Sequence, residues 1–343
     1  MASITLMILA VILCSRTSGA TSRGGLFEAS AVTEKHEQWM ARYHRAYSDE
    51  TEKTNRFEIF KKNLEFVERH NMNTNMTYKL DVNQFSDLTD EEFRVRYTGL
   101  VVPEDVLKIS SSDSDKKVSF KHENVSDTGE SMDWRQEGAV TPVKNQGHCG
   151  VCWAFSAVAA VEGITKIAKG ELLSLSEQQL LDCSRDFNQG CAGGIMSKAF
   201  EYIIKNQGIT TEDNYPYQES QQTCSSTRPV AATISGYETL PRDDEKSLLK
   251  AVSKQPVSVA INGHEAAFKQ YRGGIFDGDC GTQLTHAVTI VGYGMSEEGT
   301  KYWLLKNSWG QTWGENGYMR IKRDAELPEG MCGLARLAFY PLA

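Results

Sequence analysis

The sequence predicts an α+β protein with two lobes, preceded by a separate helical segment. Beyond residue 148 the chain shows patterns typical of helices and, later, patterns typical of strands. The helical stretches are residues 152–170, 176–183 and 195–206, and the strand stretches are residues 257–261, 287–293 and 302–306. Helices that come first and strands that come later favour an α+β arrangement over an alternating one.

The first twenty residues carry a targeting pattern. Residues 4–13 form an apolar run, and small residues follow it up to Ser18-Gly19-Ala20. This is typical of a cleaved secretory signal peptide over residues 1–20. A run of about ten apolar residues is too short to cross a bilayer, which needs about twenty. We therefore expect export through the secretory pathway and no membrane attachment after the signal is removed.

Residues 21 to about 100 have a helical and charged pattern. Apolar residues recur at three- and four-residue steps through residues 52–71, which predicts a helix with one apolar face. Residues 109–117 are polar and low in complexity, as in a flexible linker open to proteolysis. These patterns indicate a boundary between about residues 105 and 130.

Composition excludes one large class of partner. The formal charge is −8 over 343 residues, and 40% of the residues are hydrophobic. Such a chain has an ordinary globular composition and no basic surface for nucleic acid.

Cysteine usage points to disulfides and one spare thiol. Removing the signal removes Cys14 and leaves seven cysteines, all beyond residue 148: Cys149, Cys152, Cys183, Cys191, Cys224, Cys280 and Cys332. In an oxidising compartment six of these can pair as three disulfides, in fifteen ways, and the seventh is either incidental or reactive.

Cys149 and Cys152 stand three apart, just before an alanine-rich stretch of helical composition. A thiol in the first turn of a helix lies at the positive end of the helix dipole, which favours the thiolate and therefore a nucleophile. The same spacing also occurs in redox pairs and zinc sites. The odd cysteine count and the missing βαβ context weigh against a redox pair, and the absence of a second close Cys/His pair weighs against zinc.

A cysteine nucleophile needs a base, and the base needs a group that orients it. Of seven histidines, His286 has the most suggestive setting, because it begins the apolar run 287–291 and so lies at a strand end. Asn307 follows a second predicted strand and could accept a hydrogen bond from the imidazole, shielded by Trp309. Cys152, His286 and Asn307 are therefore a candidate triad.

The run Gln-Gly-His-Cys-Gly-Val-Cys-Trp at residues 146–153 matches the signature C-G-[SA]-C-[WY] except at its third position, where Val151 is a departure. On this run and its distant His and Asn, the chain resembles precursors of papain-type, cathepsin L-like cysteine proteases over almost its whole length. Within that family it resembles the plant senescence-associated group. The resemblance implies a cysteine endopeptidase with a papain-like two-lobe fold, a helical left lobe and a β-barrel-like right lobe, preceded by a helical inhibitory prodomain.

The resemblance also implies roles for single residues. Cys152 would be the nucleophile, His286 the general acid and base, and Asn307 the orienting group. Gln146 and the Cys152 N–H would form the oxyanion hole. Two departures stand out: Val151, which we expect to alter rate or fit without abolishing activity, and Thr285, where many relatives carry Asp, which we expect to shift the pH dependence.

For the remaining cysteines the resemblance implies the pairs Cys149–Cys191, Cys183–Cys224 and Cys280–Cys332. Gly193 and Gly194 match the cleft wall along which a substrate backbone pairs like an added strand. The resemblance also makes Trp309 a substrate-binding residue. The pocket for the second residue before the cleaved bond matches apolar positions only, which predicts a preference for Leu, Val or Phe over Arg. These positions are Ile195, Met196, Ala260, Leu284, Ala287 and Leu337.

Two family patterns mark the leader. The E-R-F-N-I-N pattern is matched by Glu52, Arg56, Phe60, Asn63, Val67 and Asn71, and G-x-N-x-F-x-D by Asn83, Phe85 and Asp87, with Asp81 in place of glycine. The resemblance implies a propeptide over residues 21–127 with an inhibitor domain at about 36–93, and a peptidase domain over 128–343. Maturation is expected near residues 125–130, triggered by acid through protonation of carboxylates such as Asp87.

The expected partners are protein and peptide substrates, the chain's own propeptide as an intramolecular inhibitor, and cystatin-type inhibitors. We expect a monomer without cofactor or metal, located in the lysosome or vacuole, outside the cell, or both. Asn75 and Asn124 begin N-x-[ST] glycosylation acceptors. The main alternative is an inactive storage or binding protein of the same fold, against which the filled catalytic positions argue.

Overall fold

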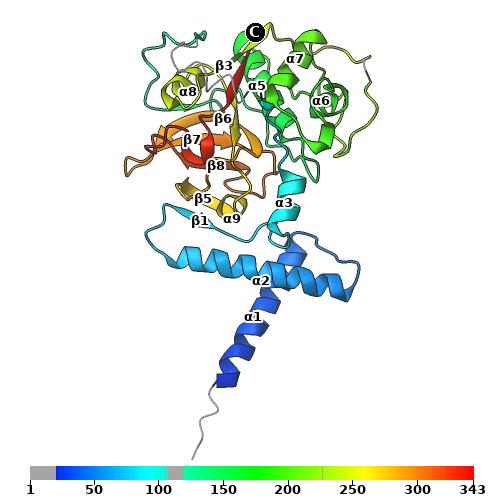
Figure 1. The fold of residues 1–343 in the computed structure, drawn as a ribbon, viewed down its shortest axis with the longest axis vertical. Helices are drawn as coiled ribbons and strands as arrows, with labels where there is room; N and C mark the ends of the chain where they lie inside the picture. Colours follow the sequence, from blue (N-terminus) through cyan, green and yellow to red (C-terminus); the bar gives the residue numbers. More distant parts are fainter. Residues whose placement is uncertain (1–20, 105, 107–118, 226) are drawn as a thin grey trace, which may run out of the picture.

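The computed structural model describes residues 21–104, 106, 119–225 and 227–343. The predicted signal peptide and most of the predicted linker lie outside these residues. Figure 1 shows helices α1 (Thr21–Arg42) and α2 (Glu50–Met72) crossing below the rest of the molecule, with α3 (Asp90–Tyr97) leading upward from them. We call residues 21–104 the N-terminal segment.

The N-terminal segment has its own small core, in which Trp39, Phe60 and Leu64 are buried together. Asp49 caps α2 by accepting a hydrogen bond from the Glu52 N–H. The sequence had predicted a helical segment, but the structure is not helical throughout. It contains the strand β1 (Tyr78–Leu80), which pairs antiparallel with β5 (Tyr271–Phe276) of a distant part of the chain. A partner strand, rather than local propensity, fixes this backbone.

The left lobe contains three helices at nearly the predicted positions: α5 (Cys152–Lys169), α6 (Glu177–Cys183) and α7 (Met196–Lys205), with a 3₁₀ turn η1 (Gly190–Ala192) before α7. Most of α5 is buried, as its alanine-rich, apolar sequence predicts. It ends at Gly170, whose φ of 80° is the left-handed conformation that glycine adopts at a helix end.

The right lobe is built on a nine-stranded sheet in the order β1-β5-β8-β7-β6-β4-β9-β3, with β2 paired to β6. The pairs are antiparallel except for the parallel pair of β5 and β8. Its strands and helices, besides β1 and β5, are β2 (Met132–Asp133), β3 (Gly236–Thr239), α8 (Glu245–Val252), β4 (Val257–Ile261), α9 (Ala266–Lys269), β6 (His286–Met295), β7 (Lys301–Lys306), β8 (Tyr318–Lys322), η2 (Met331–Gly333) and β9 (Ala338–Leu342).

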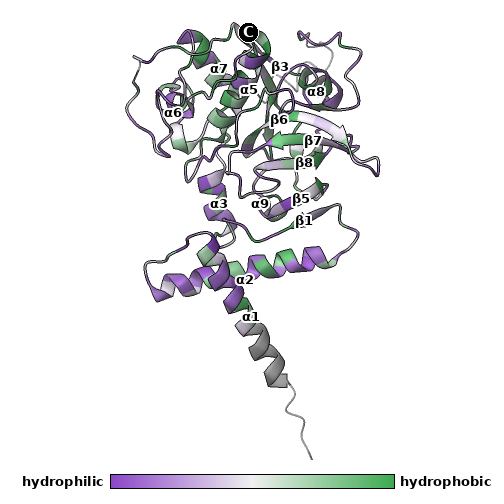
Figure 2. Ribbon diagram, turned by 180° about the vertical axis from the view of Figure 1, so that it is seen from behind, coloured by the Kyte–Doolittle hydropathy of each residue, from purple (hydrophilic) through white to green (hydrophobic). Residues whose placement is uncertain are grey.

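The two lobes meet where α5 lies against β4 and β6. The Ser156 hydroxyl donates to the Val288 carbonyl at 2.8 Å, and the Ser258 hydroxyl donates to the Ser156 carbonyl at 2.9 Å. Figure 2 shows hydrophobic residues concentrated on α5 and the central strands, whereas much of α2 and α3 is hydrophilic. The junction thus combines an apolar core with a few specific polar contacts.

Three disulfides staple the lobes. They are Cys149–Cys191 and Cys183–Cys224 in the left lobe and Cys280–Cys332 in the right lobe, the pairs that the resemblance implied. Within the described residues Cys152 is the free cysteine. Across the same residues, no helix has both the length and the apolar character needed to cross a membrane.

Candidate active site

Cys152 is the first residue of α5 and is fully buried. Burial raises the pKa of its thiol to about 12, although backbone N–H groups of Ala287, Trp153 and Gly99 favour the ionised form. The sequence had led us to expect a thiolate from the helix dipole. Loss of hydration outweighs that dipole while Gly99 of the N-terminal segment covers the sulfur, so the thiol is the stable form here.

His286 and Asn307 come together from neighbouring strands. His286 begins β6, Asn307 directly follows β7, and His286 Nε2 lies 2.8 Å from Asn307 Oδ1. Because the same Oδ1 accepts from the Ser308 N–H, it acts as the acceptor and places the imidazole proton on Nε2. The Trp309 indole stacks on the imidazole at 4.5 Å between ring centroids.

His286 is neutral in this state. Burial lowers its pKa to about 4, and the hydrogen bond to Asn307 only partly offsets this effect. Its Nδ1 is buried without a hydrogen-bond partner. The next residue, Ala287, offers its backbone N–H to the Cys152 sulfur, so the imidazole and the thiol are close neighbours. An unpartnered imidazole nitrogen beside a protonated thiol is placed to receive its proton once water reaches the site and both pKa shifts relax.

Gln146 lies at the same place and is fully buried. Its Nε2 donates to the Cys149 carbonyl at 2.9 Å and to the Tyr97 carbonyl at 3.2 Å, while its Oε1 accepts from the Ser308 hydroxyl at 2.6 Å. Trp309 Nε1 also donates to the Tyr97 carbonyl, at 3.1 Å. A carbonyl of the N-terminal segment therefore occupies the Gln146 donor that the sequence had assigned to the oxyanion hole.

Beyond Tyr97 the N-terminal segment crosses the site in an extended conformation. The N–H groups of Gly99 and Leu100 both donate to the Thr285 carbonyl at 3.1 Å. Gly194 donates to the Gly99 carbonyl and accepts from the Val101 N–H, each at 2.9 Å, so that Leu100 pairs with Gly194 as a parallel bridge. The segment is held by backbone contacts on both walls of the site.

Glycines make this close approach possible. A Cβ atom added to Gly99 would lie 2.0 Å from the Gly150 carbonyl oxygen, and one added to Gly193 would lie 2.8 Å from the Gly99 carbonyl oxygen. Gly193 also has a φ of 123°, which side chains rarely tolerate. The predicted cleft wall at Gly193 and Gly194 is therefore a surface along which another backbone can lie.

The six apolar positions expected to line one pocket share a single apolar cluster. Ile195, Met196, Ala260, Ala287 and Leu337 are buried in it, and Leu284 packs against it. Leu100 of the N-terminal segment belongs to the same cluster. No sequence signal predicted the contacts of Tyr97, Gly99 and Leu100, because the two leader patterns end before them, the later one at Asp87, and these residues have no distinctive composition.

A buried group of charges lies behind the site, at the junction of the lobes. Lys144 Nζ is 2.8 Å from Glu177 Oε1 and 3.2 Å from Glu162 Oε1. Glu162 also accepts from the Thr141 hydroxyl, and Thr141 accepts from Lys306 Nζ at 2.8 Å. Sequence reasoning missed this group, because its members are far apart along the chain.

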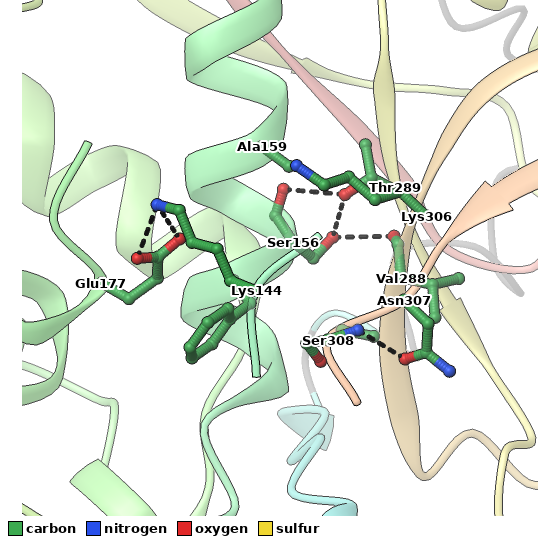
Figure 3. A pocket seen from close by; sticks show the side chains of 11 residues that line it. Lys144, Ser156, Ala159, Glu177, Val288, Thr289, Lys306, Asn307 and Ser308 are labelled. Carbon is green, nitrogen blue, oxygen red and sulfur yellow. Dashed lines mark hydrogen bonds and ion pairs between the residues drawn. The ribbon is translucent and has the colours of Figure 1, made fainter. Parts of the chain in front are cut away.

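A cavity of about 20 Å³ separates these charges from the triad, and its volume suits about one water molecule. Its lining includes Lys144, Glu177, Lys306, Asn307 and Ser308. Figure 3 shows Lys144 turned toward Glu177 on one side and Asn307 receiving the Ser308 N–H on the other. Lys306 precedes Asn307 in the chain, so the charged group is directly connected to the position of the asparagine.

Comparison with known proteins identifies the family. Residues 128–342 match the papain family of cysteine proteases. The chain belongs to that family. Residues 36–93 match the cathepsin propeptide inhibitor domain I29, so this papain-family protease is made as a zymogen whose own propeptide is its inhibitor.

Relatives of this papain-family protease match along nearly its whole length. The senescence-specific cysteine protease SAG39 of Oryza sativa subsp. indica is 48% identical over 334 residues, 96% of this chain and 95% of its own. The senescence-specific cysteine protease SAG12 of Arabidopsis thaliana is 52% identical over 316 residues, 90% of each chain.

Solved structures show the same papain-like fold with a propeptide in place. A recombinant stem bromelain precursor is 45% identical, with a TM-score of 0.83 over 91% of this chain and 99% of its own. Digestive procathepsin L2 from the Tenebrio molitor larval midgut is 41% identical, with a TM-score of 0.81 over 91% of this chain and 100% of its own.

Proposed function

We propose that this papain-family protease is an endopeptidase in which Cys152 attacks the substrate and His286 moves the protons. The observation that carries the proposal is the His286 imidazole, held through Nε2 by Asn307, covered by Trp309, and left with a free Nδ1 beside the one unpaired thiol of the described chain. When the N-terminal segment leaves, water reaches the thiol, and its proton passes to Nδ1. The helix dipole of α5 then stabilises the thiolate.

The thiolate forms a bond to the carbonyl carbon of the substrate, and the negative oxygen takes the place of the Tyr97 carbonyl beside Gln146 Nε2 and the Cys152 N–H. The imidazolium donates its proton to the leaving amine, which departs and leaves a thioester. Water then attacks the thioester while His286 accepts its proton. That proton returns to the sulfur as the acid product is released.

We further propose that the substrate backbone pairs with Gly194 at the place of Leu100 but in the opposite chain direction, and that the apolar pocket takes Leu, Val or Phe as the second residue before the cleaved bond. The proposed layout is a signal peptide over 1–20, a propeptide over 21–127 and a peptidase domain over 128–343. Residues 126, 127 and 129–131 are exposed and offer an accessible maturation site. Asn75 and Asn124 are exposed as well, as glycosylation requires.

Acidic maturation and a vacuolar, lysosomal or extracellular location are part of the same proposal, because a secreted zymogen that opens in acid would become active in an acidic compartment. Cystatin-type inhibitors would compete for the cleft, and the mature enzyme would act as a monomer. The inactive storage protein stays the alternative.

Alkylation distinguishes these functions. The matured protein is treated with iodoacetamide without reductant, the label is mapped, and hydrolysis of a peptide with Leu at the second position before the cleaved bond is measured. We expect one rapid adduct, at Cys152, and complete loss of hydrolysis, with Cys152→Ser inert in both assays. Labelling of Cys149 and Cys152 only after reduction, without hydrolysis, would indicate a redox protein. A protein that is neither labelled rapidly nor active would be a storage or binding protein.

A further inference from the structure

Lys269 is a fully buried cation whose ion-pair partner belongs to the N-terminal segment. It is the last residue of α9, its side chain has an exposed fraction of 0%, and its Nζ lies 2.6 Å from Asp90 Oδ1 at the start of α3. Asp90 is its one ion-pair partner among the described residues. A buried ammonium without a partner is strongly unfavourable. Removal of the N-terminal segment takes this carboxylate away and leaves Lys269 as an unpaired positive charge at the vacated surface.

The position vacated beside Lys269 adjoins the candidate active site. The Phe93 ring lies 5.7 Å from Lys269 Nζ, and its centroid is 5.2 Å from that of Trp309, which in turn stacks on His286. Phe93 is fully buried, and Phe268 packs edge-on to Trp309 beside it. Once Phe93 has left, Lys269 and the Trp309 indole border the same apolar space.

The path of the N-terminal segment indicates which end of the cleft lies beside Lys269 and Trp309. The chain passes Trp309 at Tyr97, the Cys152 sulfur at Gly99 and Gly194 at Val101. This step rests on the proposed function, in which Gly194 pairs with residues before the cleaved bond. Residues after the cleaved bond then lie on the other side of Cys152, over Trp309 and toward Lys269.

We propose that Lys269 makes the mature enzyme selective for peptides with an acidic residue among the first three positions after the cleaved bond. Asp90 occupies, in the precursor, the place of that substrate carboxylate. The path from the Trp309 ring to the Phe93 ring and on to Lys269 Nζ consists of steps of 5.2 and 5.7 Å. An extended peptide covers this length with about three residues, at about 3.3 Å each. Lysine donates as a mobile point charge, so it can serve more than one of these positions.

The test uses internally quenched peptides with Leu at the second position before the cleaved bond and Asp, Asn or Lys at each of the three positions after it. We expect kcat/KM for Asp to exceed that for the isosteric Asn by about threefold to tenfold at one or more positions, as a partly screened ion pair allows. In Lys269→Met the ratio of kcat/KM for the Asp peptide to that for the Asn peptide falls to about one. In Lys269→Glu the Lys peptide becomes the preferred substrate.

Lys301→Met is the matched control, because Lys301 is a half-exposed lysine paired with Asp324 at the start of β7, and it leaves the ratio unchanged. Each ratio compares two peptides on one enzyme sample, so incomplete maturation of a variant does not affect it. If no Lys269 variant matures, the wild-type ratio measured in 1 M salt decides, since screening must reduce it.

A wild-type ratio near one overturns the proposal, as does a ratio that survives Lys269→Met or 1 M salt. Failure of the proposed function would look different. In that case neither these peptides nor a dye amide with nothing after the cleaved bond would be hydrolysed by the wild-type protein.

Discussion

At the scale of single residues, Thr285 stands out because it adjoins His286 and also holds the N-terminal segment. Its carbonyl accepts the Gly99 and Leu100 N–H groups, while its hydroxyl accepts from the Gly263 N–H at 3.3 Å. The Thr285 side chain is neutral and adds no charge beside the imidazole of His286. In relatives with Asp at this position a carboxylate would be present there.

We predict that Thr285→Asp raises the pKa of the His286 imidazolium in the mature enzyme, because a nearby negative charge favours the protonated ring. The active ion pair then persists to higher pH, and the alkaline limb of the pH profile of kcat/KM moves upward by about one unit. Thr285→Asn introduces the neutral isostere of Asp, is the control, and leaves the alkaline limb in place. An equal shift in both variants would contradict an electrostatic cause.

Val151, the other departure from the family signature, is fully buried and lies in the apolar cluster of the left lobe. Its backbone occupies the capping position before α5, without a side-chain cap. The extra methyl groups at this position thus add to the core beside Cys152. That Val151 adjusts the fit of the site and leaves its chemistry intact stays a prediction.

At the scale of elements, helices α2 and α3 are joined by a charged clasp. The Arg56 guanidinium donates to both Glu92 oxygens, at 2.7 and 2.8 Å, and holds the pKa of that carboxyl down to about 2. A carboxyl with a lowered pKa contributes stability that is fully present above its usual value and is lost only as the pH falls toward about 2. At pH 4 to 5 this clasp therefore stays closed, and the acid-triggered release that we propose needs another group.

We propose His36 as the group through which acid would release the segment. It is buried among Trp39, Tyr47, Phe57 and Phe60, and its Nε2 has no hydrogen-bond partner. Burial lowers its pKa, against the opposing charges of Glu37 and Asp87, and Lys53 lowers it further. Below the ordinary histidine pKa of about 6.5 the unfolded segment binds a proton that the folded one refuses, so the stability of the segment falls as the pH drops.

We predict that His36→Phe slows conversion of the precursor at pH 4.5 to 5.5 by at least about threefold and leaves the rate at pH 7 nearly unchanged. The phenylalanine keeps the aromatic packing and removes the titrating group. Conversion is followed by gel electrophoresis between pH 4 and 7. As a comparison, Glu92→Gln breaks the clasp and should speed conversion at every pH. An unaltered pH profile in His36→Phe would show that another group controls release.

At the scale of the whole molecule, the junction of the lobes rests on the buried charges around Glu162. This side chain has an exposed fraction of 1%, accepts from the Thr141 hydroxyl and the Leu175 N–H, and lies near Lys144 and Lys306. Lys306 immediately precedes Asn307. The buried charges at the junction of the lobes are therefore connected directly to the backbone that positions Asn307.

We predict that Glu162→Gln destabilises the precursor by about 3 to 5 kcal/mol, since it leaves two buried lysines short of a compensating charge. Urea unfolding, monitored by tryptophan fluorescence, measures the loss. Glu137→Gln, at an exposed position, is the control and changes the free energy of unfolding by less than about 0.5 kcal/mol. A similarly small change for Glu162→Gln would mean that water compensates the two lysines.

Much of this molecule could be predicted from local sequence. The periodicity of residues 152–170 and the apolar strands around 257–261 and 302–306 were sufficient for the two lobes, and a short motif was sufficient to select Cys152 and Gln146. The capping box of Thr89 and Glu92 was present in the sequence and could have predicted α3. In contrast, β1 exists because β5 offers it a partner, and Lys269 meets Asp90 across 179 positions. Such pairings depend on the folded chain.

The sheet of the precursor has one strand that maturation takes away. With β1 gone, the hydrogen-bonding groups of β5 on that side face water, and such an open edge is a template for aggregation between molecules. This edge is protected by its own sequence, because the lost pairing covers only three residues and is already irregular, and because Arg272 and two glycines occupy its centre. These features oppose edge-to-edge pairing between mature molecules after the strand is lost.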